Sequence, residues 1–188
     1  MADITINDGL PVADLNDPTQ PALTLFASQT VLNDYAQSNL GRGSQTLCQK
    51  IYVDGVVDIA EVVLTLGAHT SGPRAELEFW TDADRAGVQL GDNSDWVLIN
   101  VTGTTSTTEF TFAFNPPVKL DADCFLHLMN PHVVYPVYWR TSTDENDYID
   151  SNYLAYKDGV AISGNEVFAF KLNRVSGLDD NGEWNIDL

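Results

Sequence analysis

The chain has 188 residues, of which 44% are hydrophobic and 10% aromatic, so it can bury a core and is not a disordered polymer. Its 27 acidic residues outweigh its 9 lysines and arginines and give a formal net charge of −18. A surface of this sign repels phosphate, so we expect no nucleic-acid partner, and the charge favours cationic or metal partners.

The chain opens with the polar and acidic residues MADITIND, so we expect no cleaved export signal. No run approaches the roughly 18 apolar residues that a membrane-spanning helix needs. We therefore expect a soluble product with no membrane partner.

Residues 1–21 contain few large apolar side chains, and most of these stand alone among Asp, Asn, Gly and Pro, as do Ile4, Ile6 and Leu10. Such a segment cannot bury enough surface to fold by itself. The alternation over residues 3–7 would let it add as a strand to the edge of a sheet. We predict an extended N-terminal docking arm, which could dock on its own domain or on another subunit.

Beyond the arm, short segments that alternate apolar and polar residues are separated by turn signals such as Asp54-Gly55. We predict strands at residues 22–26, 47–53, 62–66, 74–80, 96–101, 109–114, 124–129, 133–140 and 167–172. Residues 29–37 could form a turn of helix or an irregular loop. No segment has a convincing amphipathic helical pattern.

Two of these segments, EFTFAF at 109–114 and CFLHLM at 124–129, are the clearest. The first places three phenylalanines on one face of a half-buried strand, whereas the second has large side chains on both faces, which suggests cover on both sides. The Pro-Pro sequence between them predicts a non-helical turn. The pair would form either a β-hairpin or a crossover between two sheets.

Strands of this number and spacing predict an all-β fold, a two-sheet β-sandwich, because a single open sheet would leave one aromatic face in water. We prefer a jelly-roll-like arrangement to an immunoglobulin arrangement. The sandwich domain would span residues 22–175. Residues 176–188 would form a short acidic C-terminal tail that docks through the alternating residues Trp184, Ile186 and Leu188.

The sequence shows no catalytic constellation, so we predict that the protein is not an enzyme. There is no Gly-x-Ser-x-Gly motif, and a pair of glycosidase carboxylates could be recognised only in space. The three histidines, His69, His127 and His132, are too scattered for a metal site, and we expect His127 to be a core or interface residue. Cys48 and Cys124 fall within predicted strands, where two buried thiols are favoured over a disulfide.

Three acidic clusters invite comparison with calcium sites, because Ca²⁺ takes about six to eight oxygen ligands. They are Asp144, Glu145, Asp147 and Asp150; residues 179–183; and Asp82, Asp84, Asp92 and Asp95. In so acidic a chain, solvated loops and turns explain all three, and the first cluster is kept as the calcium candidate. No other cofactor is expected.

Aromatic residues gather in the later part of the chain, at Tyr135, Tyr138, Trp139, Tyr148, Tyr153 and Tyr156. Tyrosine and tryptophan combine a flat apolar face with a polar tip, which suits sugar rings and protein interfaces alike. We predict a glycan or protein contact here, although packing within the sandwich would also explain many of these residues.

Several segments resemble a known strand pattern. LCQKIYV at 47–53 is similar to an "aQsF-t" strand, residues 77–84 with Gly87 to "l-v-iy-d-g-pg", residues 110–120 to "ytF-f-pvtL", and Tyr138-Trp139-Arg140 to "y-wr". This is the pattern of the choice-of-anchor type R domain and related β-sandwich modules of bacteria and phages, and the resemblance covers about residues 24–175. Gln49 matches the family's glutamine, but the glycine pair expected near Tyr153 is absent. The resemblance implies a jelly-roll-like module for display or carbohydrate contact, without an enzymatic site.

Two functional hypotheses follow. The first is a structural protein of a tailed-phage virion, either a capsid decoration (cement) subunit or a tail accessory protein, which docks through its termini on other virion proteins such as the major capsid or tail protein. We expect a homo-oligomer, with a trimer as its simplest form. The second is a carbohydrate-binding or receptor-binding β-sandwich module.

Overall fold

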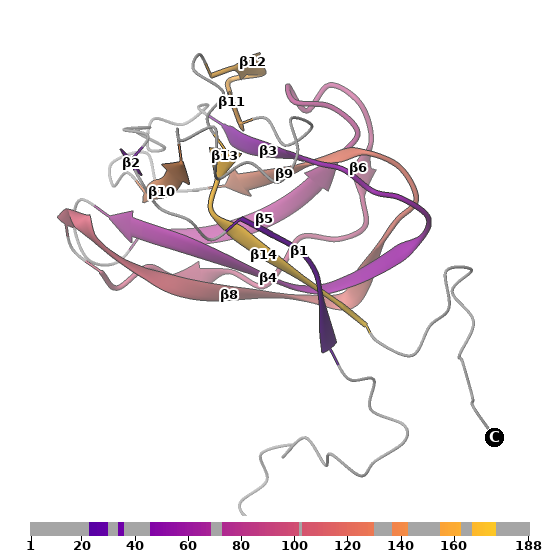
Figure 1. The fold of residues 1–188 in the computed structure, drawn as a ribbon, viewed down its shortest axis with the longest axis horizontal. Helices are drawn as coiled ribbons and strands as arrows, with labels where there is room; N and C mark the ends of the chain where they lie inside the picture. Colours follow the sequence, from indigo (N-terminus) through magenta and orange to yellow (C-terminus); the bar gives the residue numbers. More distant parts are fainter. Residues whose placement is uncertain are drawn as a thin grey trace, which may run out of the picture.

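The computed structural model describes residues 23–29, 34–35, 46–68, 73–101, 103–129, 137–142, 155–162 and 167–175. In these ranges the chain is all β, without a helix, and two antiparallel sheets lie face to face (Figure 1). The predicted fold class, a jelly-roll-like β-sandwich, is confirmed.

The first sheet is built around one long strand, β4. Its described strands are β1 (Leu23–Gln29), β2 (Asp34–Tyr35), β4 (Val57–Ala68), β8 (Gly103–Leu120), β10 (Val137–Ser142), β13 (Val167–Phe168) and β14 (Phe170–Val175). β8 pairs along one edge of β4, while β14 and β10 share the other edge, and β1 pairs with the outer edge of β14. β2 and β13 both pair with β10.

The second sheet runs in the order β12-β11-β3-β9-β5-β6, and β7 also pairs with β5. Its described strands are β3 (Leu47–Ile51), β5 (Arg74–Trp80), β6 (Gln89–Leu90), β7 (Val97–Leu98), β9 (Cys124–Met129), β11 (Ala155–Lys157) and β12 (Val160–Ala161). β6 and β7 lie along one edge of β5, and β9 lies along the other.

Alternate residues of each sheet fill the space between the layers, as the period of a strand requires. Phe112 and Phe114 of β8 are buried, and the Phe114 ring lies 5.3 Å from that of Phe79 on the facing sheet. Gln49 of β3 points into the same interior, where its Oε1 accepts a hydrogen bond of 2.8 Å from the backbone N–H of Phe168. This bond ties the two sheets together and satisfies a polar group that would be costly to bury alone.

The two clearest segments of the sequence lie in different sheets, because β8 pairs with β4 whereas β9 pairs with β3 and β5. The connection is therefore a crossover and not a hairpin. The link between the two segments is non-helical, as predicted, but its turn follows the prolines: β8 continues through Pro116 and Pro117 to Leu120, and the chain bends at residues 121–123. The register with β4 shifts at the prolines, between the pairs Glu61/Ala113 and Ile59/Val118. Proline is tolerated in such a bulge because no ladder N–H is needed.

Candidate functional site

The outer face of the second sheet carries an uncommon row of side chains. Glu78, His127 and Cys48 are consecutive register partners on β5, β9 and β3, so they point to the same side of the sheet. This side faces away from the other layer, yet all three residues are buried. A covering element must therefore lie over this face.

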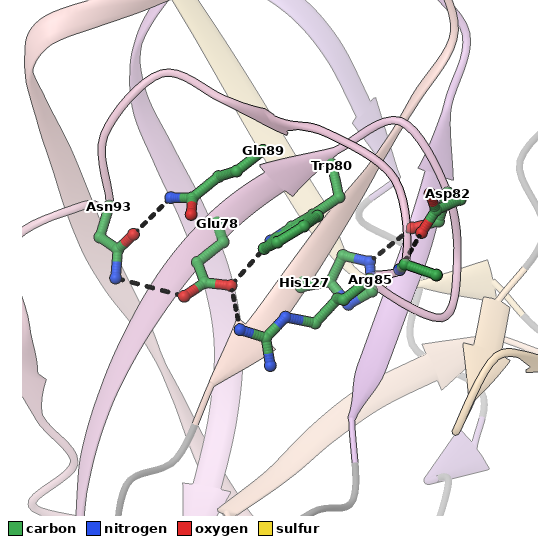
Figure 2. A network of polar contacts seen from close by, with 8 residues as sticks. Glu78, Trp80, Asp82, Arg85, Gln89, Asn93 and His127 are labelled. Atoms are coloured by element: carbon green, nitrogen blue, oxygen red, sulfur yellow. Dashed lines mark hydrogen bonds and ion pairs between the residues drawn. The ribbon is translucent and has the colours of Figure 1, made fainter.

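That element is the connection from β5 to β6, residues 81–88, which we call the clamp loop. His127 Nε2 lies 3.0 Å from the carbonyl oxygen of Asp82, and Cys48 Sγ donates to the carbonyl oxygen of Ala83 at 3.6 Å. Figure 2 shows the imidazole beneath the loop. Further along, Asp84 packs against the turn at Gly159, so the loop reaches from β5 to the β11–β12 hairpin.

Hydrogen bonds within the clamp loop fix its shape. Thr81 and Val88 close its base, through a Thr81 N–H to Val88 carbonyl bond of 3.0 Å and a Val88 N–H to Thr81 Oγ1 bond of 2.9 Å. Asp82 Oδ1 accepts from the backbone N–H of Ala86 at 2.9 Å. Gly87 lies so close to these groups that a Cβ would overlap the Asp82 carboxylate and the Thr81 hydroxyl. The acidic side chains of the loop thus serve its internal closure.

Glu78 is the centre of a polar network that holds the clamp loop against the sheet (Figure 2). Its Oε2 accepts 2.8 Å contacts from Trp80 Nε1 and from the guanidinium of Arg85, and its Oε1 accepts from Asn93 Nδ2 at 3.2 Å. Gln89 extends the chain with a 2.6 Å bond to Asn93 Oδ1. The carboxylate is 7% exposed, and these three donors compensate its burial.

Arg85 adopts a left-handed backbone conformation, with φ of 61°. This conformation costs a residue with a side chain roughly 1–2 kcal/mol. In return the side chain turns back onto the sheet, where it forms the ion pair with Glu78 and its Cζ lies 5.2 Å from the centre of the Trp80 ring. The strain is offset by a cation–π contact and a largely buried ion pair.

The sulfur and imidazole groups beneath the loop are poorly suited to chemistry. Burial, reinforced by the nearby Asp82 carboxylate, raises the pKa of the Cys48 thiol, and burial beside Asp123 raises the pKa of Cys124 to about 12. Burial lowers the pKa of His127. Thiols in this state are not nucleophiles at neutral pH. The two cysteines are free and buried, as predicted.

Beside the polar network of Glu78, the chain between β6 and β7 is held along β5 by hydrogen bonds. Ser94 exchanges two bonds with Leu77, its N–H donating to the Leu77 carbonyl at 2.9 Å and its Oγ accepting the Leu77 N–H at 2.8 Å. Two residues further on, the Trp96 side chain is 54% exposed, and the Arg74 guanidinium lies 3.8 Å from the centre of its ring. Leu98, the register partner of Arg74, is 49% exposed. We call Arg74, Trp96 and Leu98 the indole–guanidinium patch.

The aromatic residues of the predicted contact that the structure describes are buried or half-buried. Trp139 is buried in the core, where it stacks on Phe168 at 4.3 Å between ring centres and its Nε1 donates to the Ala169 carbonyl at 2.7 Å. Tyr138 is also buried. These two residues are therefore core residues and not contact residues, because β10 is covered on both faces. Tyr156 is half-buried beside Phe125.

Other predicted site residues fall outside the described ranges. These are the arm and tail residues Ile4, Ile6, Leu10, Trp184, Ile186 and Leu188, the tyrosines Tyr135, Tyr148 and Tyr153, and the calcium candidates Asp144, Glu145, Asp147 and Asp150. In the part of the chain that the structure describes, no three histidine, cysteine or carboxylate side chains come together as a metal site would require. Asp92 and Asp95 are exposed, as expected for a solvated loop.

No known family model matches this chain, and a search of curated proteins finds no similar sequence. None of the described residues forms an apolar helix of membrane-spanning length. Nothing in the sequence indicated that Arg74 would meet Trp96.

Proposed function

We propose that the protein is a non-enzymatic structural subunit of a tailed-phage virion, a capsid decoration protein or tail accessory protein. It docks on neighbouring virion proteins through the segments that precede and follow the sandwich. The sandwich supplies a rigid body, and the two segments supply the attachment.

One observation carries this proposal: the two segments join the body at the same point. Leu23, the first residue of β1, is the register partner of Val175, the last residue of β14. The points at which residues 1–22 and 176–188 join the sandwich therefore lie side by side, although they are far apart in sequence. Two segments that start together can engage one binding surface of a partner at the same time, which multiplies their separate affinities.

The surface at this corner supports an attachment role. Leu23 and Leu25 of β1 are 41% and 57% exposed, and β1 is an edge strand that pairs only with β14 among the described strands. Apolar side chains on an open sheet edge are features that soluble proteins normally cover or blunt. A partner chain at this corner would cover both the edge and the leucines.

The carbohydrate-binding alternative loses support from the burial of Tyr138 and Trp139. A sugar ring stacks on an accessible aromatic face, and Tyr138 and Trp139 are only 7% and 0% exposed. We therefore favour attachment through the termini over glycan recognition.

The test is particle incorporation. A variant without residues 1–21 should fold as the full chain does, by circular dichroism and thermal unfolding, but be missing from purified particles. The substitution Val88→Ser, at an exposed side chain at the base of the clamp loop, is the matched control and should be incorporated normally. Normal incorporation of the truncated chain would contradict the proposal, as would glycan binding by the isolated body with no effect of the arm.

A further inference from the structure

The indole–guanidinium patch is unusual for a chain with so many carboxylates. Lys50, Arg85 and Lys171 each form an ion pair with a carboxylate, at 3.1, 2.8 and 2.6 Å. Arg74 instead lies over the Trp96 ring, and no carboxylate of the described residues forms an ion pair with it. Its guanidinium thus remains available to a carboxylate from outside, next to two exposed apolar side chains.

The patch is also held in one geometry before any partner arrives. Ala75 and Val97 are register partners between β5 and β7, and the buried Ser94 fixes the chain two residues before Trp96. The Ile99 N–H donates to the Pro73 carbonyl at 2.8 Å on the other side. A prearranged surface loses little conformational entropy on binding, and tryptophan and arginine are the residues most often responsible for affinity in protein interfaces.

We propose that the indole–guanidinium patch binds residues 177–188 of a second copy of this chain. This inference rests on the proposed attachment function and names the surface on which the C-terminal segment docks. The chemistry is complementary: the segment contains four carboxylates and no lysine or arginine, together with the alternating apolar residues Trp184, Ile186 and Leu188. Its carboxylates supply a partner that Arg74 does not have among the described residues, and its apolar side chains cover Trp96 and Leu98.

Reach decides between a second copy and the same chain. Arg174, at the end of β14, pairs with Ile59, whereas the patch lies near the opposite end of β4, where Ala68 precedes β5 by a short connection. The nine residues from Ile59 to Ala68 span about 30 Å along a strand. The nine residues from Val175 to Trp184 span at most about 32 Å when fully extended. The chain's own segment could bring Trp184 to the patch only when almost fully extended, and it would still have to cross from one sheet to the other.

Such a contact joins a segment of one copy to a patch of another. Two copies can exchange their segments about a two-fold axis, or the contact can repeat from copy to copy and close into a larger ring. The expected product is a closed homo-oligomer in which each copy donates one segment and accepts one.

The test is complementation between two variants of the full sandwich, followed by sedimentation velocity. A chain without residues 177–188 keeps the patch but has no segment to donate. The variant Arg74→Glu keeps the segment but presents a repulsive patch. Each alone should be monomeric at concentrations where the parent assembles, and an equimolar mixture should form a heterodimer. Trp96→Ala should weaken assembly of the parent by roughly tenfold or more.

Two matched variants control for charge and for lost apolar surface. Lys119→Glu makes the same charge change at an exposed position of β8, and Tyr52→Ala removes an exposed aromatic side chain outside the patch. Both should assemble as the parent does. Unchanged assembly after removal of residues 177–188, or a mixture that stays monomeric, overturns the inference. Either result leaves particle incorporation through residues 1–21 to be judged by its own experiment.

Discussion

Replacing Glu78 by Ala tests whether the polar network holds the clamp loop. The change removes the acceptor of three contacts, from Trp80, Arg85 and Asn93. A hydrogen bond to a charged group contributes about 1.5–3 kcal/mol, and breaking a buried ion pair costs about 3–5 kcal/mol. The Arg85 side chain is 29% exposed, so water replaces part of the lost interaction. We therefore expect the free energy of unfolding to fall by about 2–3 kcal/mol.

Urea unfolding at neutral pH measures this change, and thermal unfolding should show Tm lower by roughly 4–12 °C, since 1 kcal/mol corresponds to roughly 2–4 °C in a chain of this size. A double-mutant cycle with Arg85→Ala isolates the ion pair and should give a coupling of about 1 kcal/mol or more. Glu109→Ala breaks the exposed pair with Lys171 and should cost less than about 1 kcal/mol. If Glu78→Ala costs no more than Glu109→Ala, the network does not hold the loop.

Two further predictions concern the same loop. Burial lowers the pKa of His127 in the folded protein, so the unfolded chain takes up a proton first as the pH falls below about 6.5, and stability decreases there. The free energy of unfolding, measured from pH 7.5 to 5, should therefore depend less on pH in the variant His127→Gln than in the parent. Equal slopes of this free energy against pH in the two proteins would refute the prediction. Gly87→Ala places a Cβ against the Asp82 carboxylate and should cost about 2–3 kcal/mol and speed proteolysis within residues 81–88. Gly55→Ala meets no neighbouring atom but is strained by its φ of 85°, so it should also lower stability while leaving the clamp loop protected.

The layers of the fold could be predicted from the sequence because each strand carries its own signal. The alternation of phenylalanine with small or polar residues at 109–114 requires one buried face, and β8 has Phe110, Phe112 and Phe114 buried. The two-sided pattern at 124–129 indicated cover on both faces, and His127 is indeed buried beneath the clamp loop. The spacing of hydrophobic residues indicates which face of a strand is buried, and this holds whatever the rest of the chain does.

Other features could not be predicted, because they depend on residues that are distant in sequence. Trp139 looks like a contact residue in sequence, and only its stacking on Phe168 and its bond to Ala169 place it in the core. Asp82 and Asp84 look like a solvated acidic cluster. In the structure Asp82 closes the clamp loop, and Asp84 meets Gly159 of the β11–β12 turn, on the far side of β9 and β3. No local pattern distinguishes an exposed carboxylate from one that has a distant partner.

The location of the positive charges connects stability with attachment. Where acidic residues outnumber basic ones threefold, there are too few cations to pair with most carboxylates, so the places where the buried or half-buried cations form pairs are informative. Lys50 and Arg85 hold segments of the body to its sheets, through Asp123 and Glu78. Among the described residues Arg74 forms no such pair, and its guanidinium lies over the exposed Trp96 ring. A guanidinium without a carboxylate partner in the described part of the chain, beside exposed Trp96 and Leu98, is placed to attract one from a neighbour. The net charge of −18 makes such a position selective, because most of the surfaces of two copies carry charge of the same sign and repel each other.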